Sequence, residues 1–308
     1  MTAAGTRDGA MRLGLLSPFS HDTVGNPVYL RRLVQAVEEA GAESFWTVEH
    51  ILVAEDYEPR YPYSADGRMP GGGAALMPDP LQVLAFVGAH TDKMRLGTSV
   101  VVATQHPALI LAKSVATLDL LSRGRVELGV GMGWQIEEYR AVNVPYEGRG
   151  RRLDETIAAM RACWGPNPVS YAGRTVAFDR VNVDPKPAQS GGVPVIIGGS
   201  SPAAARRAGR LGDGWFPYVV SPAEVAEGMA TIRAAAEAAG RDPAAIEVSV
   251  WPGSWDYSRG TDPTLLRELA EAGVDRIVFT AFEAGSADVD EVASFVTRMR
   301  RVLDDVSA

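Results

Sequence analysis

Short apolar segments alternate with segments of helical periodicity along almost the whole chain. In the helical segments, apolar residues recur at the spacing that places them on one face of a helix. About eight strand and helix units follow one another, at roughly 35 to 40 residues each, as in a (β/α)8 barrel. The predicted strands are residues 12–18, 44–48, 95–103, 125–131, 194–199, 213–218, 245–251 and 275–282.

This rhythm predicts an α/β protein, a (β/α)8 TIM barrel with insertions. A doubly wound sheet is the alternative, but it would need a break or a reversal in the alternation, which runs evenly to the end. Residues about 55–80, rich in Pro, Gly and Tyr, predict a functional lid, and residues about 168–187 alternate like a hairpin. We expect a disordered N-terminal tail at 1–11 and a single barrel domain at 12–308 that carries both insertions.

Composition argues against several classes of partner and site. The net charge is −8 without a long Lys or Arg run, so neither a nucleic acid nor an anionic membrane is an expected partner. One cysteine and four histidines make a metal cluster hard to assemble, and no metal is expected. No signal peptide is evident, and no apolar run approaches the roughly 18 residues of a membrane span, which predicts a cytoplasmic protein.

The chemistry of such a barrel gathers at the carboxyl ends of its strands. Glu49 and His50 end the second predicted strand, and adjacent residues in an extended chain point to opposite faces. His50 is the preferred polar group near a reaction centre, with a hydrogen-bonded structural histidine as the alternative. In the third strand, the small residues 97–99 are predicted to keep bulk away from the barrel mouth, while Val101 and Val102 pack its wall.

Glycines follow the fourth predicted strand. Gly129, Gly131 and Gly133 resemble a dinucleotide fingerprint, but the acidic residue that it needs would be Asp154 or Glu155, inside a helical pattern. The dinucleotide interpretation therefore fails. A strand end without side chains lets a flat or phosphorylated ligand approach the backbone, or packs tightly against a neighbouring helix.

A second glycine segment, Gly-Gly-Ser-Ser-Pro at 198–202, joins the fifth predicted strand to a helix. Ser and Pro suit a helix start, and free amides at a helix start also bind anions. A phosphate site is favoured over plain capping, because capping alone does not need the glycines. No nucleophile elbow or Walker loop is present, so a cofactor-dependent reaction fits best.

Three segments, 95–139, 148–164 and 193–218, resemble the bacterial luciferase-like monooxygenase superfamily. More closely, they are similar to its branch of actinobacterial oxidoreductases that use coenzyme F420. The resemblance spans nearly the whole chain from Arg12. It implies an insertion-bearing (β/α)8 barrel that binds FMN or F420 at the C-terminal mouth, and it implies a homodimer.

The resemblance also implies roles for individual residues. A non-prolyl cis peptide, which lies against the central ring of the cofactor, falls between Ser99 and Val100. His50 matches the histidine near the ring edge in F420-dependent sugar-phosphate dehydrogenases, and Glu49 matches their preceding acidic residue, usually aspartate. Trp134 replaces their catalytic glutamate, which suggests a more apolar substrate pocket. The phosphate and ribityl contacts map onto Met132, Gly133, Gly198, Gly199 and Ser200.

The leading functional prediction is an F420-dependent oxidoreductase that transfers hydride between C5 of the deazaflavin and a small organic substrate, with His50 and Glu49 as catalytic candidates. An FMN-dependent monooxygenase of the same superfamily is the alternative. A third possibility is a non-catalytic flavin- or deazaflavin-binding protein, against which the intact glycines at both phosphate positions argue.

Overall fold

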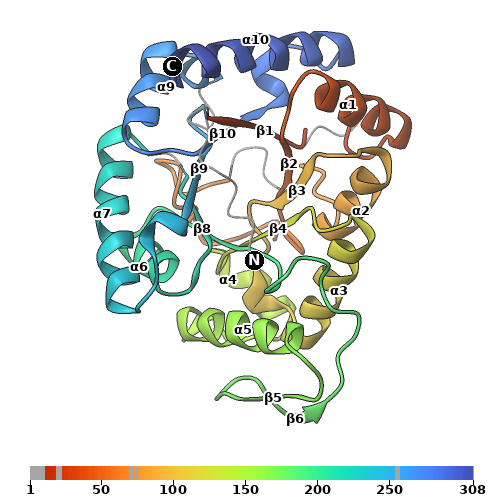
Figure 1. The fold of residues 1–308 in the computed structure, drawn as a ribbon, viewed down its shortest axis with the longest axis vertical. Coiled ribbons are helices and arrows are strands. Elements are labelled where there is room, and N and C mark those ends of the chain that lie inside the picture. The colour runs from red at the N-terminus through yellow and green to blue at the C-terminus, as the bar shows by residue number, and fades with distance from the viewer. Residues whose placement is uncertain are drawn as a thin grey trace.

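The computed structural model describes residues 11–18, 23–69, 73, 75–218, 220–253 and 257–307. Within them, eight parallel strands close into a barrel in the order β1-β10-β9-β8-β7-β4-β3-β2, with helices around the outside (Figure 1). The predicted (β/α)8 barrel is confirmed. The strands are β1 Arg12–Leu16, β2 Ser44–Thr47, β3 Arg95–Thr98, β4 Val126–Val130, β7 Val195–Gly198, β8 Gly214–Phe216, β9 Glu247–Val250 and β10 Arg276–Thr280.

Several helices begin at a polar residue followed by proline. Asp79, Ser201 and Ser221 each cap a helix by accepting a hydrogen bond from a backbone N–H of the first turn, and proline occupies the first helical position. The α-helices are α1 Pro27–Glu39, α2 Pro80–His90, α3 Ala108–Leu121, α4 Ile136–Ala141, α5 Arg149–Trp164, α6 Pro202–Leu211, α7 Pro222–Ala238, α8 Tyr257–Gly260, α9 Pro263–Glu271 and α10 Val289–Ser307. The short 3₁₀ helices are η2 Ala103–Gln105, η3 Pro243–Ala245 and η4 Ala281–Ala284.

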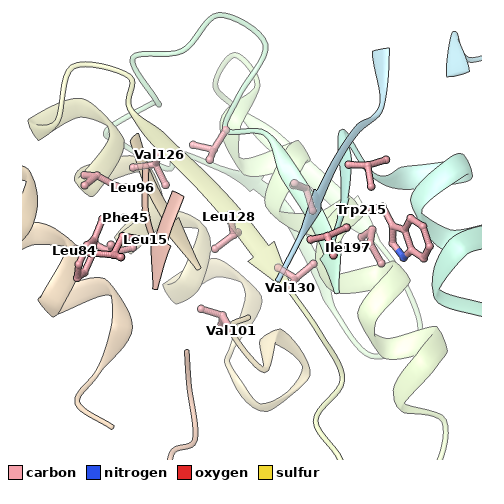
Figure 2. Packing of buried hydrophobic residues seen from close by; sticks show 14 of the residues in the cluster. Leu15, Phe45, Leu84, Leu96, Val101, Val126, Leu128, Val130, Ile197 and Trp215 are labelled. Carbon is pink, nitrogen blue, oxygen red and sulfur yellow. The ribbon is translucent and has the colours of Figure 1, made fainter. Parts of the chain in front are cut away.

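Successive strand residues pack into two different hydrophobic clusters. One set, which includes Leu15, Phe45, Leu128 and Ile197, belongs to the large core formed with the helices (Figure 2). The alternate set forms a smaller cluster that, by the alternation of side chains, fills the barrel interior. This interior cluster consists of Leu16, Trp46, Ile196, Phe216, Trp251 and Val278.

Trp46 explains one of the small residues in β3. A Cβ atom added at Gly97 would lie 2.4 Å from Cε3 of Trp46, closer than real Cβ contacts come. Gly97 therefore makes room for an indole inside the barrel, rather than for a ligand at its mouth.

Charged side chains occupy the amino end of the barrel. Arg276 is fully buried and pairs with Glu127 at 2.9 Å and with Glu43 at 3.0 Å. Burial raises the pKa of Glu127, but the charges of Arg276 and Arg95 outweigh burial and lower this pKa to about 2. This end of the barrel is thus closed by paired charges, and the site lies at the other end.

The insertions stand outside the barrel rhythm. Strands β5 Val169–Ala172 and β6 Ala177–Val181 form a two-stranded antiparallel sheet beside α5, at one extremity of the molecule (Figure 1). Residues 55–69 contain no helix or strand. Of the predicted tail, residues 1–10 lie outside the described residues, whereas Met11 is buried in the core. No helix in the described part of the chain is long and apolar enough to cross a membrane.

Candidate active site at the carboxyl end of the barrel

The segment after β3 differs from the long strand that the sequence predicts at 95–103. Strand β3 ends at Thr98, and the peptide bond between Ser99 and Val100 is cis, as the resemblance implies. One isolated bridge then joins Val101 to Val130, before η2 begins at Ala103 (Figure 2). The valine run is buried at Val101 and Val102, but its backbone leaves the sheet.

Val100 connects this segment to the two glycine segments. A Cβ atom at Gly131 would lie 2.6 Å from one methyl group of Val100, and a Cβ at Gly198 would lie 2.5 Å from the other. A Cβ at Gly129 would lie 1.7 Å from the carbonyl oxygen of Thr98. These glycines make room for the end of β3 and for Val100 after it, an explanation that neither sequence interpretation included. Residues 99–100, 131–133 and 198–200 therefore lie together.

The loop after β4 is held in place by a hydrogen bond from Tyr139. Gly133 has φ of 65°, in the left-handed region that glycine occupies easily. The carbonyl oxygen of Met132 accepts a hydrogen bond from the Tyr139 hydroxyl, which also contacts the Thr104 hydroxyl. Sequence analysis did not identify Tyr139 as part of this arrangement.

The loop between β7 and α6 has the predicted helix-start chemistry. Gly199 has φ of 109°, and a Cβ there would meet only the Ala204 methyl carbon within 4 Å, at 3.5 Å. Ser201 caps α6 by accepting from the Ala204 amide, and Ser200 Oγ accepts from the Tyr218 amide at 2.8 Å. Capping is thus present, and the phosphate contact stays a prediction.

Glu49 and His50 point to different partners, as adjacent residues of an extended segment do. Glu49 is buried, and its Oε2 accepts from the Val102 amide at 2.7 Å. His106 Nε2 donates to both carboxylate oxygens of Glu49, at 2.9 and 3.1 Å. Glu49 therefore joins the end of β2 to the segment that follows β3.

His50 pairs with Glu138, a residue that sequence analysis missed. His50 Nδ1 donates to Oε2 of Glu138 at 3.2 Å, while Oε1 accepts from the Ile51 amide at 2.7 Å. The Glu138 side chain is fully buried at this position in α4. The bond leaves Nε2 as the ring nitrogen available to a ligand, because Nδ1 is already the donor.

An aromatic cluster contains His50 and includes three tyrosines of the predicted lid. The Trp134 ring packs edge-to-face against His50 at 5.8 Å, Tyr57 at 5.1 Å and Tyr61 at 5.4 Å between centroids. The cluster consists of His50, Trp134, Tyr57, Tyr61, Tyr63, Tyr218 and Trp251. It links the loop after β4 to the ends of β8 and β9.

Tyr63 joins this cluster to the β7–α6 loop. Its ring lies 4.3 Å from that of Tyr218, and its side chain forms a hydrogen bond with Ser200. Burial, helped by the neighbouring Tyr61, raises the pKa of Tyr63 to about 12, so its phenol stays protonated at neutral pH. Among the described residues, no group of three or more His, Cys, Asp or Glu side chains is placed to hold a metal ion.

The chain is similar to known proteins over most of its length. The chain is 31% identical over 294 residues to an uncharacterised protein of Mycobacterium tuberculosis, with 94% of this chain and 97% of that protein covered. It is 32% identical over 218 residues to an F420-dependent hydroxymycolic acid dehydrogenase of the same organism, with 69% and 54% covered.

A solved structure shows the same fold at lower sequence identity. The monooxygenase from Streptomyces bottropensis superposes with a TM-score of 0.75 at 22% identity, with 97% of this chain and all of that chain covered. The model of the luciferase-like monooxygenase family matches residues 11–280. The chain therefore belongs to the luciferase-like monooxygenase family.

Proposed function

We propose that this protein is an F420-dependent oxidoreductase that transfers hydride between C5 of the deazaflavin and a small organic substrate. The observation that carries the proposal is the meeting of three segments at the barrel mouth, with Val100 between Gly131 and Gly198. The similarity to an F420-dependent dehydrogenase supports the choice of cofactor.

The residues present fit a flavin-like cofactor. A Cβ atom at Gly199 would make only an ordinary contact with Ala204, and Trp134 Nε1 is a buried donor with no hydrogen-bond partner among the described residues. Ser99 and Val100 would support the ring, and the phosphate and ribityl groups would contact the two loops. Those loop residues are Met132, Gly133, Gly198, Gly199 and Ser200. When bound, F420 supplies a carbon that gives or accepts a hydride.

His50 is the proposed proton-transfer group. Glu138 fixes the ring through Nδ1, so Nε2 can donate a proton to a carbonyl oxygen or accept one from an alcohol. The Trp134 ring packs against the His50 ring, and Tyr57 and Tyr61 pack against Trp134, so this aromatic surface would favour an apolar substrate and exclude water.

An FMN-dependent monooxygenase is the second candidate. The observation that favours it is the superposition on a monooxygenase over the whole length of that chain, although the likeness extends to the fold alone at 22% identity. The two candidates differ in chemistry, because a flavin reacts with oxygen through its ring whereas a deazaflavin is largely confined to hydride transfer.

Anaerobic turnover separates these candidates. We expect oxidation or reduction of F420 by a panel of apolar ketones and alcohols without oxygen. His50→Gln should reduce the rate about 100-fold or more, the usual contribution of general acid–base catalysis, and leave F420 affinity within about threefold. His90→Gln is the matched control, because His90 contacts a backbone carbonyl in α2. Turnover that requires oxygen and occurs with reduced FMN but not with F420 would overturn the proposal. Tight binding of F420 without turnover of any substrate would indicate a non-catalytic protein.

We also propose that the chain forms a homodimer through the outer face of α2 and α3. This face carries an open groove of about 650 Å³, with Ile110 and Leu121 64% and 75% exposed. The groove contains both Asp79 and Lys113, so two copies related by a twofold axis can pair opposite charges.

Light scattering after size exclusion tests the dimer. We expect twice the chain mass for the wild type and the single mass for the double variant Ile110→Asp, Leu121→Asp. The control is Val28→Asp, at an exposed position on α1. A monomeric wild type, or a double variant that still dimerises, would refute this interface.

A further inference from the structure

His106 is a second histidine at the barrel mouth, outside the roles proposed above. It lies directly after η2 and before α3, with its side chain 26% exposed. Its Nε2 donates to both oxygens of Glu49, whose side chain is 5% exposed. A buried carboxylate needs such a partner, because an unpaired charge away from water is costly.

Glu49 also holds the backbone of the segment that carries Val100. Its Oε2 accepts from the Val102 amide at 2.7 Å, so one carboxylate is bonded to both Val102 and His106. A Cβ atom at Gly133 would lie 2.9 Å from a methyl group of Val102. A displacement of Val102 would therefore also shift the loop after β4 and residues 99–100.

The charges around His106 favour its protonated form. Burial lowers the pKa of His106, but the hydrogen bond to Glu49 and the negative charges of Glu49, Asp79 and Glu138 outweigh burial and raise this pKa above its ordinary value of 6.5. Those carboxylates come from the end of β2, from the cap of α2 and from α4. A raised histidine pKa means that the ion pair stabilises the fold fully below pH 6.5 and that this stabilisation is lost as the pH rises through the raised value.

We propose that Glu49 and His106 form a pH-sensitive clamp that positions residues 99–102 against the cofactor. Both are positioning residues, because both oxygens of Glu49 are engaged by protein donors. Deprotonation of His106 loosens Val102 and with it Val100, so cofactor affinity falls at alkaline pH. The effect on the cofactor rests on the proposed function, whereas the effect on the segment does not.

The test uses the full chain and the variants His106→Ala and His106→Gln, with His90→Gln as the matched control. Hydrogen exchange of a peptide spanning residues 96–106 measures how tightly the clamp holds this segment when no cofactor is bound. The rates are corrected for the intrinsic pH dependence of exchange. Fluorescence titration with F420 between about pH 6 and 9 reports its consequence for binding.

We expect faster exchange confined to this peptide in His106→Ala, partial rescue in His106→Gln, and an alkaline loss of protection that only proteins with His106 show. The dissociation constant for F420 should rise about tenfold in His106→Ala at pH 6, as for loss of a hydrogen bond between charged groups. Unchanged exchange, or faster exchange throughout the chain, would overturn the clamp. If the wild type does not bind F420, the proposed function fails, and the exchange data still decide the clamp.

Discussion

Replacement of Gly198 by alanine should be costly because of one neighbour, Val100. The new Cβ atom would lie 2.5 Å from Cγ1 and 3.4 Å from Cγ2 of Val100. Valine is branched at Cβ and stiff at χ1, so its methyl groups cannot simply rotate away. Overpacking of this kind costs about 1–3 kcal/mol, and we expect Gly198→Ala to lower the free energy of unfolding by about 2 kcal/mol.

Urea unfolding of four proteins isolates this contact: the wild type, Gly198→Ala, Val100→Ala and the double variant. Removal of the valine methyl groups removes the clash, so the double variant should be more stable than the sum of the single costs predicts, by at least about 1 kcal/mol. Gly199→Ala is the control. Its cost of about 1–2 kcal/mol comes from the left-handed backbone and should not change with Val100→Ala.

If the costs of the two single variants add to within about 0.5 kcal/mol, a side chain at position 198 does not clash with Val100. Val100 would then not be the reason why residue 198 is a glycine. The interpretation in which the glycines let a ligand approach the backbone would be favoured again. The same four proteins can be titrated with F420, and Gly198→Ala should bind it more weakly, because the displaced Val100 is the proposed support of the ring.

Three further substitutions test the packing inside the barrel, the buried charges at its amino end and one acidic group near its mouth. Gly97→Ala should lower the free energy of unfolding by about 2–3 kcal/mol, because its Cβ would lie 2.4 Å from the Trp46 ring; an unchanged urea midpoint would contradict this packing. Glu127→Gln should cost about 3 kcal/mol, because Arg276 is fully buried and loses one of its carboxylates; thermal and urea unfolding measure it, and a cost below about 1 kcal/mol would show that the pair is dispensable. Burial raises the pKa of Glu283 from 4.5 to about 7, so the folded protein holds this proton more tightly than the unfolded chain does. The folded protein therefore loses about 2 kcal/mol of stability as the pH rises from about 5 to about 8. Glu283→Gln should lack that part of the pH dependence, and the same pH dependence of urea unfolding in both proteins would contradict the raised pKa.

The fold was predictable because a barrel repeats one local pattern. Each strand needs apolar residues and each helix its own periodicity, and both are visible within a few residues of sequence. The predicted strand at 95–103 was too long for a reason that local sequence hides. Val100 to Val102 have strand propensity, but only one isolated bridge, at Val101, continues the pairing beyond Thr98.

Part of the geometry of the candidate site was predictable from the sequence, but the pairing of its side chains was not. Glu49 and His50 were placed by the end of a strand and before a long loop, and alternation correctly separated their side chains. Their partners were not visible: Glu138 is 88 residues from His50, and its neighbour Glu137 is identical in type. His106 lies in a Gln-His-Pro segment, which indicated the end of a strand but no contact with Glu49.

The glycines show the same limit. Sequence can say that Gly131 and Gly198 leave space, but it cannot say what fills the space. The structure fills it with Val100, a residue of the segment after β3, because the barrel brings β3, β4 and β7 side by side. Contacts of this kind depend on the closed topology rather than on any local pattern.

A side-by-side equilibrium titration of the wild-type protein with F420 and with FMN determines which cofactor the barrel mouth prefers. Fluorescence quenching reports both cofactors under the same conditions. We expect F420 to bind with a dissociation constant at least about tenfold lower than that of FMN, a difference of about 1.4 kcal/mol. Tighter binding of FMN, or a yellow protein with an FMN spectrum as purified, would contradict it.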